Sequence, residues 1–253
     1  MHIFSARLPQ PVLVVLSIAL FSSFAFATTP DLAKHLASGN RSDADKARDA
    51  GRKPGAVLTF LEIAPGMTVV DLLAASGYYT EVLSEAVGPD GRVYAQNTDF
   101  LLKMRDGVNE KAMATRLADN RLPNVERLDR EINELGLPAD SVDVVLTALN
   151  FHDIYNGRGA DATQATLRAV HTILKPGGVL AVIDHAGNAD ADNEKLHRIE
   201  EAKAIEAAKK AGFIVEATSD VLRHPEDDRT RMVFAEGLRG MTDRFVLKLR
   251  KAP

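Results

Sequence analysis

The segment from Met67 to Asn97 constrains the fold of this chain more than any other. A short apolar run, Thr68 to Leu72, is followed by small residues up to Gly77 and then by a helical period over Tyr78 to Val87. A second short run begins at Arg92. This order predicts a strand, a loop, a helix and a second strand. In such units a ligand binds at the carboxyl end of the first strand, against the helix N-terminus.

The rest of the chain continues the alternation of strands and helices. Further strands are predicted at 125–128, 142–146, 179–183, 213–221 and 244–249, and helices at 98–117, 163–174 and 193–211. Lys175 to Gly178 is interpreted as a sharp stop before a strand, and Gly212 as a helix C-terminal cap. This alternation predicts an α/β fold with a doubly wound, mostly parallel sheet.

Composition narrows the class of protein. The chain has 253 residues, 45% of them hydrophobic, which suits one α/β domain. A net charge of −4 and the lack of a basic stripe argue against nucleic-acid binding. The chain has no cysteine, which excludes a disulfide scaffold and fits an oxidising compartment.

The N-terminus has the pattern of a secretory signal peptide. Basic Arg7 precedes an apolar run from Pro11 to Phe26, and Ala25-Phe26-Ala27 is a small-x-small cleavage site. We expect residues 1–27 to be a signal peptide cleaved after Ala27, residues 28–53 a linker with a peripheral helix, and 54–253 the α/β domain. The protein would then be periplasmic or secreted and free of the membrane. A retained membrane anchor is the alternative.

From about Pro54 to the end, the order of motifs resembles the class I S-adenosylmethionine-dependent methyltransferases. The resemblance is carried by VVDLLAASGYYTEVLSEAVGPDGRVYAQN, VDVVLTALNFHD, ILKPGGVLAVIDH and the final pair of strands after AGF. More narrowly, the chain resembles exported bacterial proteins that share DHA, LHRIEEA and RGMTDRFVLKLRK. The resemblance implies a Rossmann-like, seven-stranded sheet with an antiparallel last strand, and S-adenosylmethionine as cofactor.

The resemblance also implies a set of cofactor-binding residues. The family loop is Asp-x-Gly-x-Gly-x-Gly, whereas this chain has Leu73 and Ala75 at the first two glycine positions. Asn97 replaces the acid that holds the ribose, and Asp99 is a possible substitute. The implied cofactor-binding residues are Asp71, Ala75, Gly77, Asn97, Glu131 and Asn150. The alternative is a fold that has lost the cofactor, with Leu73 and Ala75 as packing residues.

Three histidines follow successive predicted strands or begin the next helix: His152, His185 and His197. Because these positions meet at one edge of the sheet, we expect the three to face one crevice. An imidazole titrates near neutrality, so His152 is the candidate general base. The catalytic set is His152, Asp153 and His185, with His185 or Asp184 orienting a small-molecule acceptor. The alternative is that the histidines cap strand ends.

The same residues suggest a second function. His152, Asp153, Asp184, His185 and His197 offer imidazoles and carboxylates, a ligand set suited to zinc. No short spacing such as His-x-x-x-His is present, so methyl transfer is preferred and no metal ligand is assigned. A ligand-binding module without catalysis is the other hypothesis. Residues 223–229 are interpreted as a polar surface loop, with a lid as the alternative. The sequence leaves the oligomeric state open.

Overall fold

A seven-stranded sheet forms the centre of the protein. The computed structural model describes residues 34, 36–37 and 40–252, and the strands lie in the order β3-β2-β1-β4-β5-β7-β6. Strands β1 to β5 are parallel, and β7 lies antiparallel between β5 and β6. The predicted mostly parallel sheet with its antiparallel last strand is therefore confirmed. The strands are β1 (Thr68–Leu72), β2 (Arg92–Asn97), β3 (Val125–Asp129), β4 (Val142–Ala148), β5 (Leu174–His185), β6 (Phe213–Ser219) and β7 (Arg244–Lys251).

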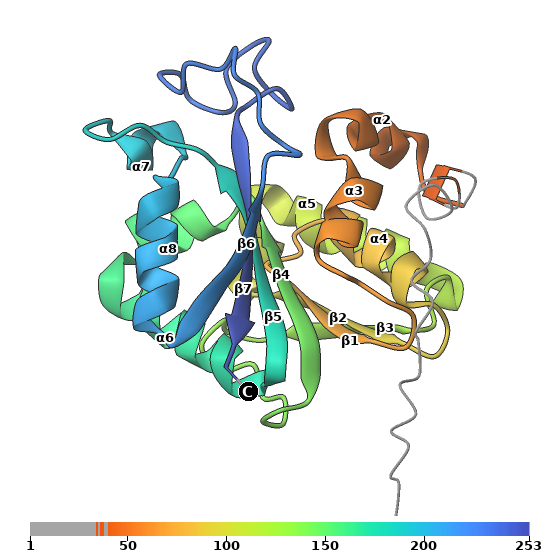
Figure 1. Ribbon diagram of the computed structural model, residues 1–253. Coiled ribbons are helices and arrows are strands. Elements are labelled where there is room, and N and C mark those ends of the chain that lie inside the picture. Colours follow the sequence, from red (N-terminus) through yellow and green to blue (C-terminus); the bar gives the residue numbers. More distant parts are fainter. Residues whose placement is uncertain (1–33, 35, 38–39, 253) are drawn as a thin grey trace, which may run out of the picture.

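Helices cover both faces of this sheet (Figure 1). One face carries α3 (Pro54–Phe60), α4 (Tyr78–Val87) and α5 (Asp99–Leu117), and the other carries α6 (Gly159–Ile173) and α8 (Glu201–Lys210). Strand β1 is buried on both sides, since Val69 packs into the cluster under α4 and Val70 into the cluster under α6. The remaining elements are α2 (Asp43–Arg52), η1 (Ala118–Asn120), the π-helical turn η2 (Asp153–Gly157) and α7 (Asn193–Leu196).

The stretch Lys175 to Gly178 differs from the sequence prediction. It does not stop the chain before a strand but belongs to β5, which begins at Leu174. The partners of Val142 and Val144 on β5 are Leu174 and Val179, so the extra residues form a bulge. Gly177 lies in this bulge with a φ of 75°, a backbone conformation that favours glycine.

The helix predicted over 193–211 is also broken. His197 has a φ of 55° and ends α7, and a new helix begins at Glu201. Between them Ile199 pairs with Ala186, just beyond the end of β5. The short extended stretch between the two helices therefore lies against the end of β5 and carries Arg198 into the interior.

This topology gathers several chain segments at one edge of the sheet. The carboxyl ends of β1, β2, β4 and β5 meet there, and β7 starts there because it is antiparallel. The long connection from β6 to β7 rises above that edge, at the top of Figure 1. The expected signal peptide lies outside the described residues. Among the described residues, no helix is both long and apolar enough to cross a membrane.

Candidate active site

The loop between β1 and α4 keeps an unusual backbone shape. Leu73, Ala75 and Gly77 have φ angles of 57°, 51° and 81°. These are the alternating positions at which the sequence pattern expects glycine, and a side chain there costs roughly 1–2 kcal/mol per residue. Leu73 packs against the apolar cluster under α6. The loop thus adopts a glycine-loop conformation with only one glycine.

Two amide side chains at the end of β2 hold this loop. The Leu73 N–H donates to Gln96 Oε1 at 2.9 Å, and the Ala75 N–H donates to Asn97 Oδ1 at 2.8 Å. Asn97 Nδ2 in turn donates to the Ala75 carbonyl at 3.3 Å, and Asn97 is only 1% exposed. Both polar atoms of the Asn97 amide are therefore bound to the loop backbone.

Asp71 joins β1 to α4. It is buried, and Thr80 Oγ1 donates to its Oδ2 at 2.7 Å. Burial raises the pKa of Asp71 to about 6, although the bond from Thr80 acts in the opposite direction. The carboxyl group therefore links the end of β1 to the first turn of α4, on either side of the loop 73–77.

Gly77 is required by packing as well as by backbone shape. A Cβ at this position would lie 2.9 Å from Cδ of Arg116 on α5. Arg116 donates to the Ser76 carbonyl at 2.9 Å and pairs with Glu81 and, at 2.7 Å, with Asp45. The guanidinium group therefore ties the loop to α4 and α2.

Asn150 and Glu131 have different surroundings. Asn150, just after β4, donates to the Leu73 carbonyl at 3.1 Å and so links β4 to the loop after β1. Glu131 is exposed, with an ion pair of 3.7 Å to Arg158. Asp99, the first residue of α5, is an exposed carboxylate paired with Lys103. Asp99 and Glu131 therefore both lie open to solvent.

His152 is buried beyond the end of β4 and is held by Asp184 of β5. Its backbone N–H donates to Asp184 Oδ2 at 2.7 Å, and its Nδ1 lies 2.8 Å from Asp184 Oδ1. His152 is 3% exposed and Asp184 is fully buried. These bonds fix the ring so that Nε2 is the atom left for other contacts.

The carboxylates around His152 favour the protonated form of its ring. Burial alone would lower its pKa, but the nearby carboxylates of Asp184 and Asp153 raise it to about 10. In the protonated form both ring nitrogens are donors.

The three histidines lie together, as the sequence predicts. The His152 ring centroid is 5.9 Å from that of His185 and 5.5 Å from that of His197. His185 is buried, with Nδ1 2.8 Å from Thr242 Oγ1. Burial, followed by the positive charges of His152 and nearby arginines, lowers the pKa of His185. Asp153 Oδ1 lies 3.3 Å from His152 Nε2 and 3.3 Å from His197 Nδ1.

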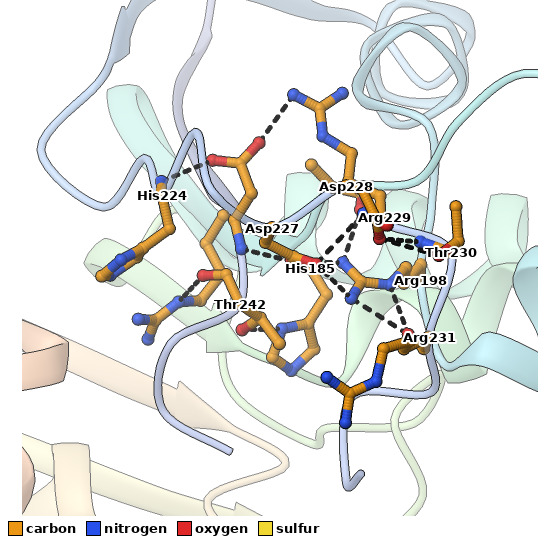
Figure 2. A network of polar contacts seen from close by, with 12 residues as sticks. His185, Arg198, His224, Asp227, Asp228, Arg229, Thr230, Arg231 and Thr242 are labelled. Carbon is orange, nitrogen blue, oxygen red and sulfur yellow. Dashed lines mark hydrogen bonds and ion pairs between the residues drawn. The ribbon is translucent and has the colours of Figure 1, made fainter. Parts of the chain in front are cut away.

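An arginine that sequence analysis missed organises the connection between β6 and β7. Arg198 is fully buried and pairs with Asp227 through both terminal nitrogens, at 2.9 and 3.1 Å (Figure 2). Arg198 also donates to the carbonyls of Ala186 and Arg231, and Asp227 accepts the Asp243 N–H. The segment 223–229, interpreted above as a polar surface loop, thus has a buried carboxylate at its centre. The feature of the sequence that could have pointed to a buried arginine is the position of Arg198 directly before the apolar Ile199.

The strand order and the antiparallel β7 are those of a Rossmann-like methyltransferase fold. Residues 70–182 match the family model for a methyltransferase domain. Over 182 residues the chain is 24% identical to the ubiquinone/menaquinone biosynthesis C-methyltransferase UbiE of Shewanella oneidensis, covering 68% of this chain and 66% of that enzyme. The chain therefore spans about two thirds of the length of this curated relative.

Solved structures share the fold. A SAM-dependent methyltransferase from Aquifex aeolicus has a TM-score of 0.61 and 21% identity, over 88% of this chain and 98% of that chain. The cyclase SpnF has a TM-score of 0.60 and 16% identity, over 88% and 92% of the two chains. The fold thus also occurs in a protein named for a different reaction. The match to the methyltransferase domain model supports S-adenosylmethionine as the cofactor.

The residues of this chain fit that cofactor chiefly through the loop, since the Asn97 amide is bonded to Ala75. The left-handed backbone at Leu73, Ala75 and Gly77 provides the loop shape, and the exposed Asp99 provides a carboxylate after β2. Asn97 has both amide atoms engaged and would have to leave Ala75 to reach a ribose. The loop backbone and Asp99 would therefore hold the cofactor, with Asn97 acting as a brace.

Proposed function

We propose that this protein transfers a methyl group from S-adenosylmethionine to a small acceptor bound beside His152. The observation that carries the proposal is the fixed, buried His152 two residues after Asn150, whose amide reaches the Leu73 carbonyl of the loop. This contact links the loop after β1 to the histidine cluster after β4. The domain match to methyltransferases supports the same reaction.

The chain's own residues would mainly position the reactants. When bound, S-adenosylmethionine supplies a methyl group activated on a sulfonium. In the metal-free protein, His152 in its protonated form donates a hydrogen bond from Nε2 to an oxygen or nitrogen of the acceptor other than the atom that takes the methyl group. Asp184 keeps the ring in one orientation, which reduces the entropy that positioning would cost.

The compartment is part of the proposal. We propose that residues 1–27 direct export and that the protein acts in the periplasm or outside the cell. The support is the sequence pattern that ends at Ala25-Phe26-Ala27. Expression of the full chain in a bacterial host, followed by fractionation and N-terminal sequencing, tests this. A start at Thr28 in the periplasmic fraction is expected, and an intact N-terminus in the cytoplasm contradicts it.

Calorimetric titration with S-adenosylmethionine and S-adenosylhomocysteine is the first test of cofactor binding. We expect saturable binding that Ala75→Leu weakens, because the longer side chain would occupy the loop surface. Ala139→Leu, at an exposed position before β4, is the matched control and should bind normally. Absence of binding by the folded wild type would contradict the proposal.

A screen of acceptors follows if the cofactor binds. Transfer of a labelled methyl group to small acceptors should depend on His152, with His152→Gln lowering the rate while cofactor affinity stays unchanged. The name of the UbiE relative puts carbon acceptors beside oxygen and nitrogen acceptors in the first screen. Equal rates for the variant and the wild type would remove His152 from the site.

A ligand-binding module without catalysis is the second candidate. It is favoured by the engagement of Asn97 with Ala75 and by the packing of Leu73. This candidate predicts that S-adenosylmethionine is neither bound nor consumed. The calorimetric experiment therefore separates the two.

A further inference from the structure

Three side chains next to the proposed acceptor site bring metal-binding atoms together. His152 Nε2, Asp153 Oδ1 and His197 Nδ1 all lie within 4.8 Å of one another. They come from two segments, the start of the π-helical turn η2 and the end of α7. Single π-helical turns occur frequently at functional sites.

The buried nitrogen of His152 is the second observation. Nε2 has no hydrogen-bond partner among the described residues, although the ring is 3% exposed. Asp153 Oδ1, 3.3 Å away, pairs with the ring when the ring is charged but does not accept a hydrogen bond from Nε2. Burying a polar atom without a hydrogen-bond partner costs free energy of folding, and a bound ligand at Nε2 would remove that cost.

The support behind His152 is that of a metal ligand. Its Nδ1 contacts the fully buried Asp184 carboxylate at 2.8 Å, which fixes the ring and makes Nε2 point toward Asp153 and His197. Metal-bound histidines almost always have such a carboxylate or carbonyl behind them. A bound cation would take the place of the Nε2 proton.

Two of the three separations between the ligand atoms suit a tetrahedral ion, and the third, between His152 Nε2 and His197 Nδ1, is below 4.8 Å. Ligands about 2.0–2.1 Å from zinc stand about 3.4 Å apart at the corners of a tetrahedron. The two separations to Asp153 Oδ1 are both 3.3 Å. We propose that His152, Asp153 and His197 bind one divalent transition-metal ion of the zinc class.

The ligand types and their exposure define the site further. Two imidazole nitrogens with one carboxylate favour zinc or a similar transition metal over magnesium or calcium, which prefer oxygen ligands. The Asp153 and His197 side chains are 59% and 37% exposed, so the fourth position opens toward solvent. Water or an oxygen atom of a substrate can occupy it. The site would therefore be of the open, three-ligand kind.

Zinc titration of the purified, chelator-treated full chain against a chromogenic chelator tests the proposal. We expect one equivalent of Zn²⁺, and with Co²⁺ the visible absorption of a tetrahedral nitrogen and oxygen site. His197→Asn should weaken binding at least about tenfold. Asparagine tolerates the left-handed backbone at position 197, so this variant should fold. Asp153→Asn, at an exposed position, should have the same effect.

His171→Asn on α6 is the matched control and should bind zinc like the wild type. The proposal is overturned if the wild type binds neither ion, or if His197→Asn and Asp153→Asn bind both as the wild type does. Equal weakening by His171→Asn would also overturn it, because binding would then be nonspecific. The inference does not rest on methyl transfer, since zinc stoichiometry is measured without S-adenosylmethionine.

Discussion

His152 Nδ1 lies 2.8 Å from Asp184 Oδ1, and the two residues come from the neighbouring strand ends of β4 and β5. The same carboxylate accepts the backbone N–H groups of His152 and His185, each at 2.7 Å. One fully buried carboxylate thus receives three N–H bonds. It joins two strand ends and fixes the ring that the proposed functions share.

Asp184→Asn should destabilise the protein by about 3 kcal/mol. The amide would place an NH₂ group where the carboxylate accepts an N–H, so at least one buried donor would lose its partner. Urea unfolding near neutral pH measures the change. Asp99→Asn, at an exposed surface pair, is the control and should change stability by less than about 0.5 kcal/mol. Equal small effects in both would show that the Asp184 bonds are weak.

Asp71→Asn should stabilise the protein at neutral pH. Burial raises the folded-state pKa of Asp71 from its usual 3.8 to about 6. The stability contributed by the protonated carboxyl is fully present below about pH 4 and is lost as pH rises through about 6, a loss of about 3 kcal/mol. Asparagine keeps an acceptor for Thr80 and does not ionise. The unfolding free energy of the variant should therefore exceed that of the wild type increasingly from about pH 4 to pH 7, and a constant difference would contradict ionisation of Asp71 as the cause.

Ala75→Gly should relieve backbone strain in the loop. Ala75 has a φ of 51°, where a Cβ costs roughly 1–2 kcal/mol. Against this, glycine loses more conformational entropy on folding than alanine, which lowers stability by roughly 0.5–1 kcal/mol. The net gain in unfolding free energy should be at most about 1.5 kcal/mol, measured by thermal and urea unfolding. If the loop binds S-adenosylmethionine, the same variant should keep or raise that affinity. Clear destabilisation would mean that the alanine side chain packs favourably.

Asp227→Asn should loosen the connection between β6 and β7. The change removes one charge of a buried pair and leaves Arg198 uncompensated, at a cost of about 3–5 kcal/mol. Limited proteolysis should then cut first within residues 223–241, before the sheet unfolds. Asp228→Asn, at an exposed carboxylate that accepts two hydrogen bonds from Thr230, is the control. Identical cleavage of both variants would show that the Arg198 pair does not hold this segment.

The bounds of β1 and of α4 were predictable to the residue, because the sequence patterns that indicate them are local. The apolar run ending at Leu72, the small residues before Tyr78 and the helical period up to Val87 are all contained in one short segment. The break between α7 and α8 at His197 was not predictable. The neighbouring Arg198 binds Asp227, which lies far away in the sequence. The same holds for the bulge after Leu174, which depends on pairing with β4.

The candidate site was predictable in its location and less in its bonding. Strand-end positions brought His152, His185 and His197 together as expected. Sequence position did not reveal that Asn97 turns back onto Ala75, because that choice depends on the shape of the folded loop. Nor did it reveal the pKa of His152, which depends on two carboxylates brought close by folding.

The antiparallel insertion of β7 has a consequence for synthesis on the ribosome. The chain makes β5 long before β7, and until Arg244 to Lys251 have emerged β5 has an unpaired edge of apolar residues. Unpaired edges of this kind associate readily with other chains. Thr242, which contacts His185, also arrives only with this late segment. A nascent chain, or one truncated before Thr242, therefore lacks both the strand that covers the edge of β5 and the hydroxyl that contacts His185, and we expect it to associate with other chains more readily than the full chain.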